Sequence, residues 1–256
     1  MKRIDILGPP GSGKTTISRA IINSPGGHNI FSPRHVKANI LAEKFRSDVV
    51  SLPDVLRDIV FRLFKGYPAP RIDQASLASF LRDNLARYDE LIEKAIDSVS
   101  KDRDTSPIMR AKRIGWLVSS FEDIALLEAF CSEKIVICDE SLFTRVLLLA
   151  FPTSSTIEQI KPYSSLFVPD FFIYLRISRD ELLNRLRQRA RVTFDHSGIH
   201  EAEMEAAVGR SIDALELSFQ RAQALGVKGI EIDAERDLDK NLDEIKRHLL
   251  QLNGSK

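Results

Sequence analysis

The chain has 256 residues, of which 43% are hydrophobic and 29% are charged, a composition that excludes disordered, collagen-like and disulfide-scaffold classes. Its 37 Lys and Arg nearly balance 36 Asp and Glu, so the formal charge of +1 gives no overall attraction to nucleic acid or to an anionic membrane. The N-terminal apolar run breaks at Gly8, and no stretch reaches the roughly 18 apolar residues of a membrane span. We therefore expect one cytoplasmic domain over residues 1–256, with two reduced cysteines and with neither nucleic acid nor membrane as a partner.

The first strand and the loop after it carry the most specific pattern. Residues 3–7 (RIDIL) alternate as a strand does, and Gly8, Gly13, Lys14 and Thr15 fit the phosphate-loop pattern G-x-x-x-x-G-K-[ST]. Glycines let successive backbone N–H groups point at phosphate oxygens, the lysine places a charge on the β and γ phosphates, and the threonine offers a hydroxyl to Mg²⁺. The helix expected next adds the partial positive charge of its N-terminus.

This loop predicts a site for a nucleoside triphosphate, with ATP and Mg²⁺ as the expected ligands. The alternative is a Gly/Pro-rich turn between a strand and a helix that binds nothing. The residues expected to bind the nucleotide are Gly8, Pro10, Gly11, Ser12, Gly13, Lys14, Thr15 and Thr16, with Lys14 also catalytic and Thr15 also a metal contact.

A long helical insertion follows the second strand, which is expected over residues 28–32. Between 33 and 131 no convincing strand occurs, and apolar residues recur at three- and four-residue steps. This spacing predicts helices over 38–50, 52–66, 74–99 and 113–130. We interpret 33–131 as the acceptor-binding region, with Arg34 and Arg113 as candidate anion contacts. Arg113 could equally only solvate the start of its helix.

A third strand is expected over residues 134–138, because KIVIC is a continuous, β-branched apolar run of the kind that forms buried parallel strands. It ends at two candidate catalytic carboxylates, Asp139 and Glu140. Such acids can hold Mg²⁺, orient an attacking water, or take a proton from an acceptor hydroxyl. We expect Asp139 to contact the metal or the acceptor with Glu140 as its partner, and either could be the base. Alternatively, one of them only caps the helix that follows.

The helix expected over residues 178–191 begins with the capping box SRDE, in which Glu181 is expected to reach back to the cap. Arginines follow at positions 185, 187, 189 and 191, and Arg185 and Arg189 share one face of the helix. One interpretation is a basic helix end that is stabilised by the helix dipole. The other is a lid over approximately 185–210, whose guanidinium groups close over the transferred phosphoryl group.

The remaining elements complete an alternation of strands and helices. A fourth strand is expected over 170–177, a helix over 201–219, a last strand over 229–232 and a closing helix over 239–252. Parallel strands joined by right-handed helical crossovers are the usual outcome of this order. The sequence therefore predicts an α/β domain.

Together these parts resemble the nucleoside monophosphate kinase and thymidylate kinase group of P-loop proteins. The resemblance rests on GPPGSGKTT, CDES, PDFFIYLRISRDELLNRLRQRAR and GIEIDAERDLDKNLDEIKRHLL, and it does not cover the long middle of the chain. It implies a three-layer P-loop fold with a five-stranded parallel sheet in the order 2-3-1-4-5. It further implies Arg185 and Arg189 as lid residues at the nucleotide, and the segment around Ala234 against the adenine.

The acceptor motif of this group is not reproduced. Thymidylate kinases tend to carry Asp-Arg after the third strand and deoxynucleoside kinases Glu-Arg-Ser, where the arginine helps to hold the acceptor. This chain has Asp139, Glu140 and Ser141, and the nearest arginine is Arg145, a candidate acceptor contact. We predict an ATP-dependent small-molecule kinase whose acceptor, a nucleotide, a nucleoside or another metabolite, is left open. The alternative is a partner-regulated ATPase or switch, and a homodimer is compatible with the sequence.

Overall fold

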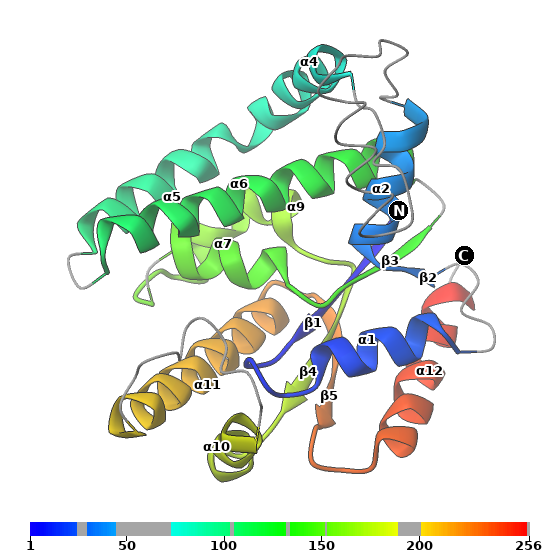
Figure 1. Cartoon of the computed structure of the whole chain (residues 1–256), viewed down its shortest axis with the longest axis vertical. Helices are drawn as coiled ribbons and strands as arrows, with labels where there is room; N and C mark the ends of the chain where they lie inside the picture. Colours follow the sequence, from blue (N-terminus) through cyan, green and yellow to red (C-terminus); the bar gives the residue numbers. More distant parts are fainter. Residues whose placement is uncertain are drawn as a thin grey trace, which may run out of the picture.

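A five-stranded parallel sheet forms the centre of the computed structural model, which describes residues 1–24, 30–44, 73–102, 105–131, 134–151, 153–188 and 201–254. The strands are β1 (Lys2–Leu7), β2 (Ile30–Phe31), β3 (Ile135–Cys138), β4 (Phe171–Arg176) and β5 (Lys228–Asp233). They lie in the order β2-β3-β1-β4-β5, and all neighbouring pairs are parallel (Figure 1). The expected α/β fold and strand order are confirmed.

The central strands are apolar on both faces because helices cover both sides of the sheet. All four residues of β3 are buried, which agrees with a continuous apolar run rather than an alternating one. On β1, Ile4 and Ile6 belong to the core on one side, whereas Leu7 belongs to the core on the other side. Since side chains alternate along a strand, Asp5 shares the face of Leu7.

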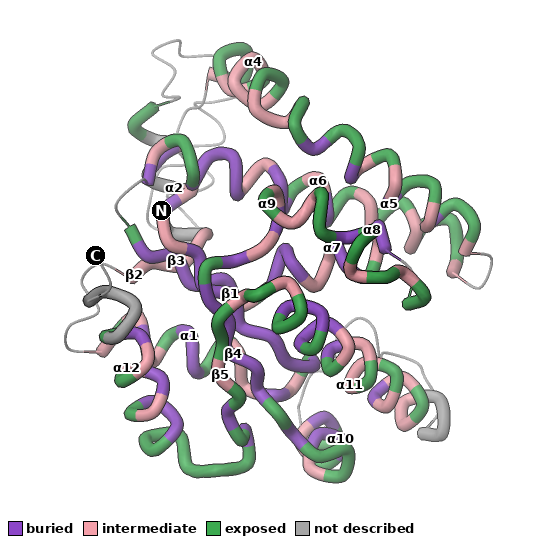
Figure 2. Tube along the Cα trace, turned by 180° about the vertical axis from the view of Figure 1, so that it is seen from behind, coloured by how far each residue is buried: buried purple, intermediate pink, exposed green. Residues whose placement is uncertain are grey.

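Three helices pack on the Ile4 face of the sheet: α1 (Lys14–Ile22), α10 (Arg179–Gln188) and α12 (Leu238–Gly254). The opposite face is covered by α6 (Pro107–Phe130), α7 (Leu142–Ala150) and the C-terminal half of α11 (Glu201–Ala224). In Figure 2 the buried positions follow the strands and the sides of these helices that face them. The result is the three-layer arrangement that amphipathic helices on a parallel sheet produce.

The helical insertion between β2 and β3 contains α2 (Pro33–Lys44), α4 (Gln74–Leu85), the 3₁₀ turn η2 (Ala86–Tyr88), α5 (Asp89–Lys101) and α6. The helix expected over 74–99 is therefore wrong as a single element, because η2 interrupts it. Tyr88 is fully buried at this turn and stacks on Phe121, with 4.3 Å between the ring centroids. The helix expected over 52–66 lies outside the described residues.

Three short segments that the periodicity did not predict join α7 to β4. They are α8 (Ile157–Ile160), η3 (Lys161–Tyr163) and α9 (Ser164–Phe167). Segments of one turn are too short to establish a helical period in the sequence. Of the helices in the described ranges, none combines the length and the apolar character that crossing a bilayer requires.

Candidate functional site

The loop between β1 and α1 forms a concave backbone surface. Gly11 and Gly13 have φ angles of 103° and 97°, in the left-handed region that L side chains disfavour. A Cβ atom on Gly11 would lie 2.9 Å from Leu182 Cδ1 of α10, whereas one on Gly13 would meet no atom within 4 Å. Gly11 therefore permits close packing of the loop against α10, and Gly13 faces open space.

The polar groups of this loop are arranged for an anion. The Ser12 side chain is buried, and its hydroxyl finds no hydrogen-bond partner among the described residues. Buried hydroxyls are normally paired with protein or with a bound group. Lys14 Nζ donates to the carbonyls of Gly8 and Pro9, the latter at 3.0 Å, which holds the ammonium over the loop. With the N–H groups at the start of α1, these residues fit a chain of phosphates.

Asp139 and the phosphate loop meet at one edge of the sheet. Asp139 follows β3, which lies next to β1, and the Thr15 hydroxyl donates to Asp139 Oδ2 at 3.0 Å. Mg²⁺ prefers such oxygen ligands and usually combines one or two carboxylates with phosphates and water. No group of three or more His, Cys, Asp or Glu that could hold a metal ion occurs in the described ranges. Thr15 and Asp139 offer two oxygen ligands of the kind that could hold Mg²⁺.

A cavity of about 830 Å³ opens beside Thr15 and Asp139. Small-molecule sites usually measure roughly 300–1,000 Å³, so this one has room for a metabolite. Its polar and charged walls include Ser18, Arg19, Ser32, Lys37, Ser120, Asp123, Glu140 and Arg145. A separate cavity of about 690 Å³ between α5 and α8 contains no residue of the phosphate loop.

Arg145, the candidate acceptor contact, lines the cavity of about 830 Å³. Its guanidinium forms an ion pair with Glu140 and donates to the Ser120 hydroxyl and, at 3.1 Å, to the Trp116 carbonyl. The Arg145 side chain is 28% exposed, whereas that of Glu140 is 74% exposed. Contacts with both α6 and Glu140 thus fix the guanidinium at the cavity wall.

A second ion pair in the cavity wall was missed by the sequence analysis. Lys37 of α2 contacts Asp123 of α6, and each side chain is about one third exposed. The two residues are 86 positions apart and belong to no local motif. The only available signal was that both lie in the predicted acceptor-binding insertion.

Neither carboxylate after β3 is the side-chain cap of α7. Ser141 is the N-cap, because its hydroxyl accepts the backbone N–H of Thr144 at 3.1 Å. The alternative that Asp139 or Glu140 only caps this helix is therefore wrong. Both carboxylates line the cavity instead.

The helix α10 packs against the sheet through Leu182, Leu183 and Leu186, which are buried. Arg185 does not extend into solvent: its Nε donates to Glu181 Oε1 at 2.7 Å, and its Nη2 donates to the Ala234 carbonyl at 2.9 Å. The hydrogen bond from Arg185, followed by that from Asn184, lowers the pKa of the Glu181 carboxyl. Arg185 thus joins α10 to the loop after β5.

The capping box predicted at the start of α10 is only half correct. The Glu181 N–H donates to the Ser178 hydroxyl at 3.3 Å, as expected. The Glu181 side chain turns to Arg185 instead of reaching back, and Glu235 Oε1 accepts the Ser178 N–H at 2.7 Å. A residue of the loop after β5 therefore completes the cap, which is a second link between this loop and α10.

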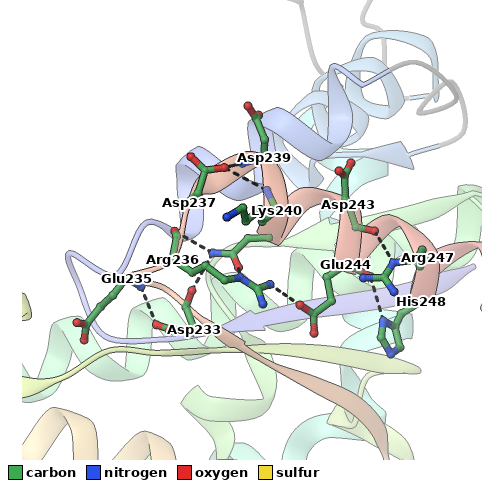
Figure 3. A network of polar contacts seen from close by, with 11 residues as sticks. Asp233, Glu235, Arg236, Asp237, Asp239, Lys240, Asp243, Glu244, Arg247 and His248 are labelled. Atoms are coloured by element: carbon green, nitrogen blue, oxygen red, sulfur yellow. Dashed lines mark hydrogen bonds and ion pairs between the residues drawn. The ribbon is translucent and has the colours of Figure 1, made fainter.

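The loop after β5 is also tied to α12. Buried Asn241 donates to the Asp233 and Arg236 carbonyls and accepts from Arg236 Nε at 2.9 Å. Arg236 extends to Glu244 in an ion pair, and the polar network continues along the helix (Figure 3). These bonds fix the backbone on both sides of buried Ala234, the position where the resemblance places the adenine.

Of the remaining predicted site residues, Arg113 is described and is not brought to the site. Arg113 donates to Asp102 at 3.2 Å near the start of α6 and does not line the 830 Å³ cavity. Arg34 lies in α2 directly after Pro33, a residue of the cavity wall, but its side chain is outside the described part of the chain. In the predicted lid segment 185–210, residues 189–200, which include Arg189 and Arg191, also lie outside the described residues.

No protein-family model and no curated protein matches the sequence. Similar solved structures include deoxyadenosine kinase from M. mycoides with dCMP and a flexible dCDP bound, and the same kinase with dATP bound. They match at 17% identity with TM-scores of 0.48 and 0.47, over 98% and 96% of this chain and 99% and 98% of theirs. Shikimate kinase from Bacteroides thetaiotaomicron matches at 10% identity with a TM-score of 0.43, over 97% of this chain and 98% of its own. At these identities and scores, the matches carry no information about the reaction.

Proposed function

We propose that this chain is a kinase that transfers the γ-phosphoryl group of ATP to a hydroxyl group of a small molecule held in the 830 Å³ cavity. The hydrogen bond between Thr15 and Asp139, 3.0 Å long, gives this proposal its main support, because it joins the phosphate loop to the cavity. A donor on the loop and an acceptor in the cavity would meet at one carboxylate. Such proximity is a large part of phosphoryl-transfer catalysis.

The donor side of the proposed site is the segment from Gly8 to Thr16. Lys14 would exchange the carbonyls of its own loop for β- and γ-phosphate oxygens, and the loop N–H groups would bind the same phosphates. Thr15 and Asp139 would hold Mg²⁺, which when bound neutralises charge on the phosphates. The backbone near Ala234 would lie against the adenine.

In the proposed reaction the acceptor hydroxyl oxygen attacks the γ-phosphorus, and the bond from that phosphorus to the β–γ bridging oxygen breaks. The products are ADP and the phosphorylated acceptor, and the hydroxyl proton passes to Asp139 or Glu140. Arg185 and Arg189 are the proposed lid cations that stabilise negative charge on the transferred group. The bond from Arg185 to the Ala234 carbonyl would couple the position of the lid helix to binding of the base.

The acceptor side combines apolar side chains with charged groups, and most of these charges are paired. The cavity wall carries four charged groups in two ion pairs, Arg145 with Glu140 and Lys37 with Asp123. Paired charges present donors and acceptors in fixed directions, which suits a molecule with several hydroxyl or amide groups. Arg34 is proposed as a further contact at the α2 side.

The decisive test is incubation of the protein with Mg²⁺ and γ-labelled ATP, alone and with pooled nucleosides, nucleotides, sugars and sugar acids. We expect one pool to yield a labelled organic phosphate. Lys14→Ala and Asp139→Asn should lower its rate about 10²- to 10³-fold, the usual loss when an electrostatic contact to the reacting group is removed. The control Asp243→Asn changes an exposed carboxylate of α12 outside the site and should leave the rate unchanged.

The same assay can reject the proposal. Label released only as inorganic phosphate with every pool would indicate a nucleotide hydrolase, and the search would then turn to a protein partner that raises the rate. Equal activity of Lys14→Ala and the parent protein would remove the phosphate loop from the chemistry. Comparison of the pH–rate profiles of Asp139→Asn and Glu140→Gln would identify the base, because only loss of the base removes the acidic limb.

A further inference from the structure

A fully buried carboxylate lies directly beneath the Asp139 turn. Asp5 is the fourth residue of β1, is 0% exposed, and pairs in register with Cys138, the residue before Asp139. It shares a sheet face with the apolar core around Leu7 and Phe143. Its partner Arg3 is also buried, at 4% exposed. A charged pair at the centre of an apolar layer is unusual, and the proposed reaction has no use for it as a substrate contact.

The hydrogen bonds of Asp5 connect it to the start of α7. Oδ1 accepts from Arg3 Nε at 3.1 Å, and Oδ2 accepts from the Ser141 hydroxyl at 2.7 Å and from the Phe143 N–H at 3.4 Å. Arg3 is held in turn by the Phe167 carbonyl. The carboxylate is therefore fully paired, which is the condition under which a buried charge is tolerated.

The Ser141 hydroxyl is held both as a donor and as an acceptor. Its hydroxyl proton is donated to Asp5, and its oxygen accepts the Thr144 N–H at 3.1 Å. The turn that carries Asp139 and Glu140 is thus anchored at its far end by Asp5 through Ser141. Its near end is anchored by the bond from Thr15 to Asp139. Two anchors two residues apart therefore hold the turn that carries both carboxylates.

We infer that Asp5 is a positioning residue that acts through Ser141 to hold Asp139 and Glu140 at the edge shared by the phosphate loop and the cavity. This inference rests on the proposed function. Replacing a buried ion pair by well-packed apolar residues is often neutral or stabilising, so stability alone is a weak reason for a buried ion pair in this core. Fixed placement of catalytic groups is a better reason, because displacements of about 1 Å can reduce rates on the order of 10²-fold.

The test compares Asp5→Asn, Ser141→Ala and the double variant, with one matched control for each single variant. Asp170→Asn also removes a carboxylate bonded to Arg3, through the backbone N–H at 2.7 Å, but at the opposite end of the strand. Ser106→Ala removes the N-cap hydroxyl of α6, outside the site. We expect Asp5→Asn and Ser141→Ala to lower kcat about 10- to 100-fold, with KM for ATP changed less than about threefold.

The double variant should be no slower than the worse single variant, because both changes break the same anchor. The controls should retain the parent kcat. Equal kcat values in Asp5→Asn, Ser141→Ala and the controls would overturn the inference, as would single effects that multiply in the double variant. If Asp5→Asn does not fold, the inference is still decided by comparing the kcat of Ser141→Ala with that of Ser106→Ala.

A second readout separates failure of this inference from failure of the proposed function. Binding of a fluorescent, non-hydrolysable ATP analogue is measured with and without Mg²⁺, which requires no acceptor. If Asp139 is displaced, the gain in affinity from Mg²⁺ should shrink about tenfold in Asp5→Asn and Ser141→Ala and stay unchanged in the controls. If the parent protein phosphorylates no acceptor, the proposed kinase activity is refuted. The gain in ATP-analogue affinity from Mg²⁺ would still test the role of Asp5. An unchanged gain in both variants would refute the anchor.

Discussion

The phosphate loop makes a quantitative prediction at Gly13. Gly13→Ala places a Cβ atom at φ 97°, where no protein atom lies within 4 Å. Contacts therefore add nothing to the change in stability, and only backbone strain remains, about 1–2 kcal/mol for an L residue in this region. For a domain of this size each kcal/mol corresponds to roughly 2–4 °C, so the melting temperature should fall by about 2–8 °C.

The effect on nucleotide binding should be larger than the effect on stability. The new methyl group would occupy the open space over the loop and keep a phosphate from at least one backbone N–H. A hydrogen bond to a charged group contributes about 1.5–3 kcal/mol, so the affinity for ATP should fall roughly 10- to 150-fold. Isothermal titration calorimetry gives this affinity directly, and differential scanning calorimetry gives the melting temperature.

Gly226→Ala is the matched control. Gly226 precedes β5, has φ 79°, and its added Cβ would also meet no atom within 4 Å. Both substitutions should therefore lower the melting temperature by similar amounts, whereas only Gly13→Ala should weaken ATP binding. If the two variants bind ATP with the same affinity, the open space over Gly13 is not a phosphate site and the reasoning fails.

Three further predictions concern the stability of the fold. Arg221→Met removes a buried guanidinium that donates to the Thr153 carbonyl at 2.8 Å, and urea titration should show a loss of about 1.5–3 kcal/mol in the free energy of unfolding. Burial raises the pKa of Tyr88 to about 12. Above about pH 10 the folded state therefore keeps the phenol proton, whereas the unfolded state loses it. Stability should therefore fall by about 2–3 kcal/mol between pH 10 and 12, and the fall should be smaller by that amount in Tyr88→Phe. Gly229→Ala would put a Cβ atom within 2.4 Å of the Phe172 ring, and thermal unfolding should show a loss of about 1–3 kcal/mol.

The parts of the fold that could be predicted from the sequence depend on short-range signals. The run IVIC and the pattern of the phosphate loop each specify their structure within about ten residues, so β3 and the turn before α1 were predicted correctly. The 3₁₀ turn at Tyr88 was not, because it depends on stacking with Phe121 of another helix. Helical periodicity is the same on both sides of such a break.

The site divides in the same way. The bond between Thr15 and Asp139 could be anticipated, since carboxyl ends of neighbouring parallel strands meet at one edge of the sheet. Two other contacts could not be anticipated: the ion pair of Lys37 with Asp123 and the bond of Asp5 with Ser141. Their partners are 86 and 136 positions apart, and no motif connects them. The position of Arg185 on its helix face led to its prediction as a lid residue. Its bond to the Ala234 carbonyl could not be predicted, because it depends on where β5 lies in the fold.

The two carboxylates after β3 occupy different environments. Glu140 forms an ion pair at the cavity wall with Arg145 of α7. Asp139 contacts Thr15 on the side of the phosphate loop. In the proposed reaction Asp139 is therefore the residue suited to the metal, and Glu140 with Arg145 is the pair suited to the acceptor.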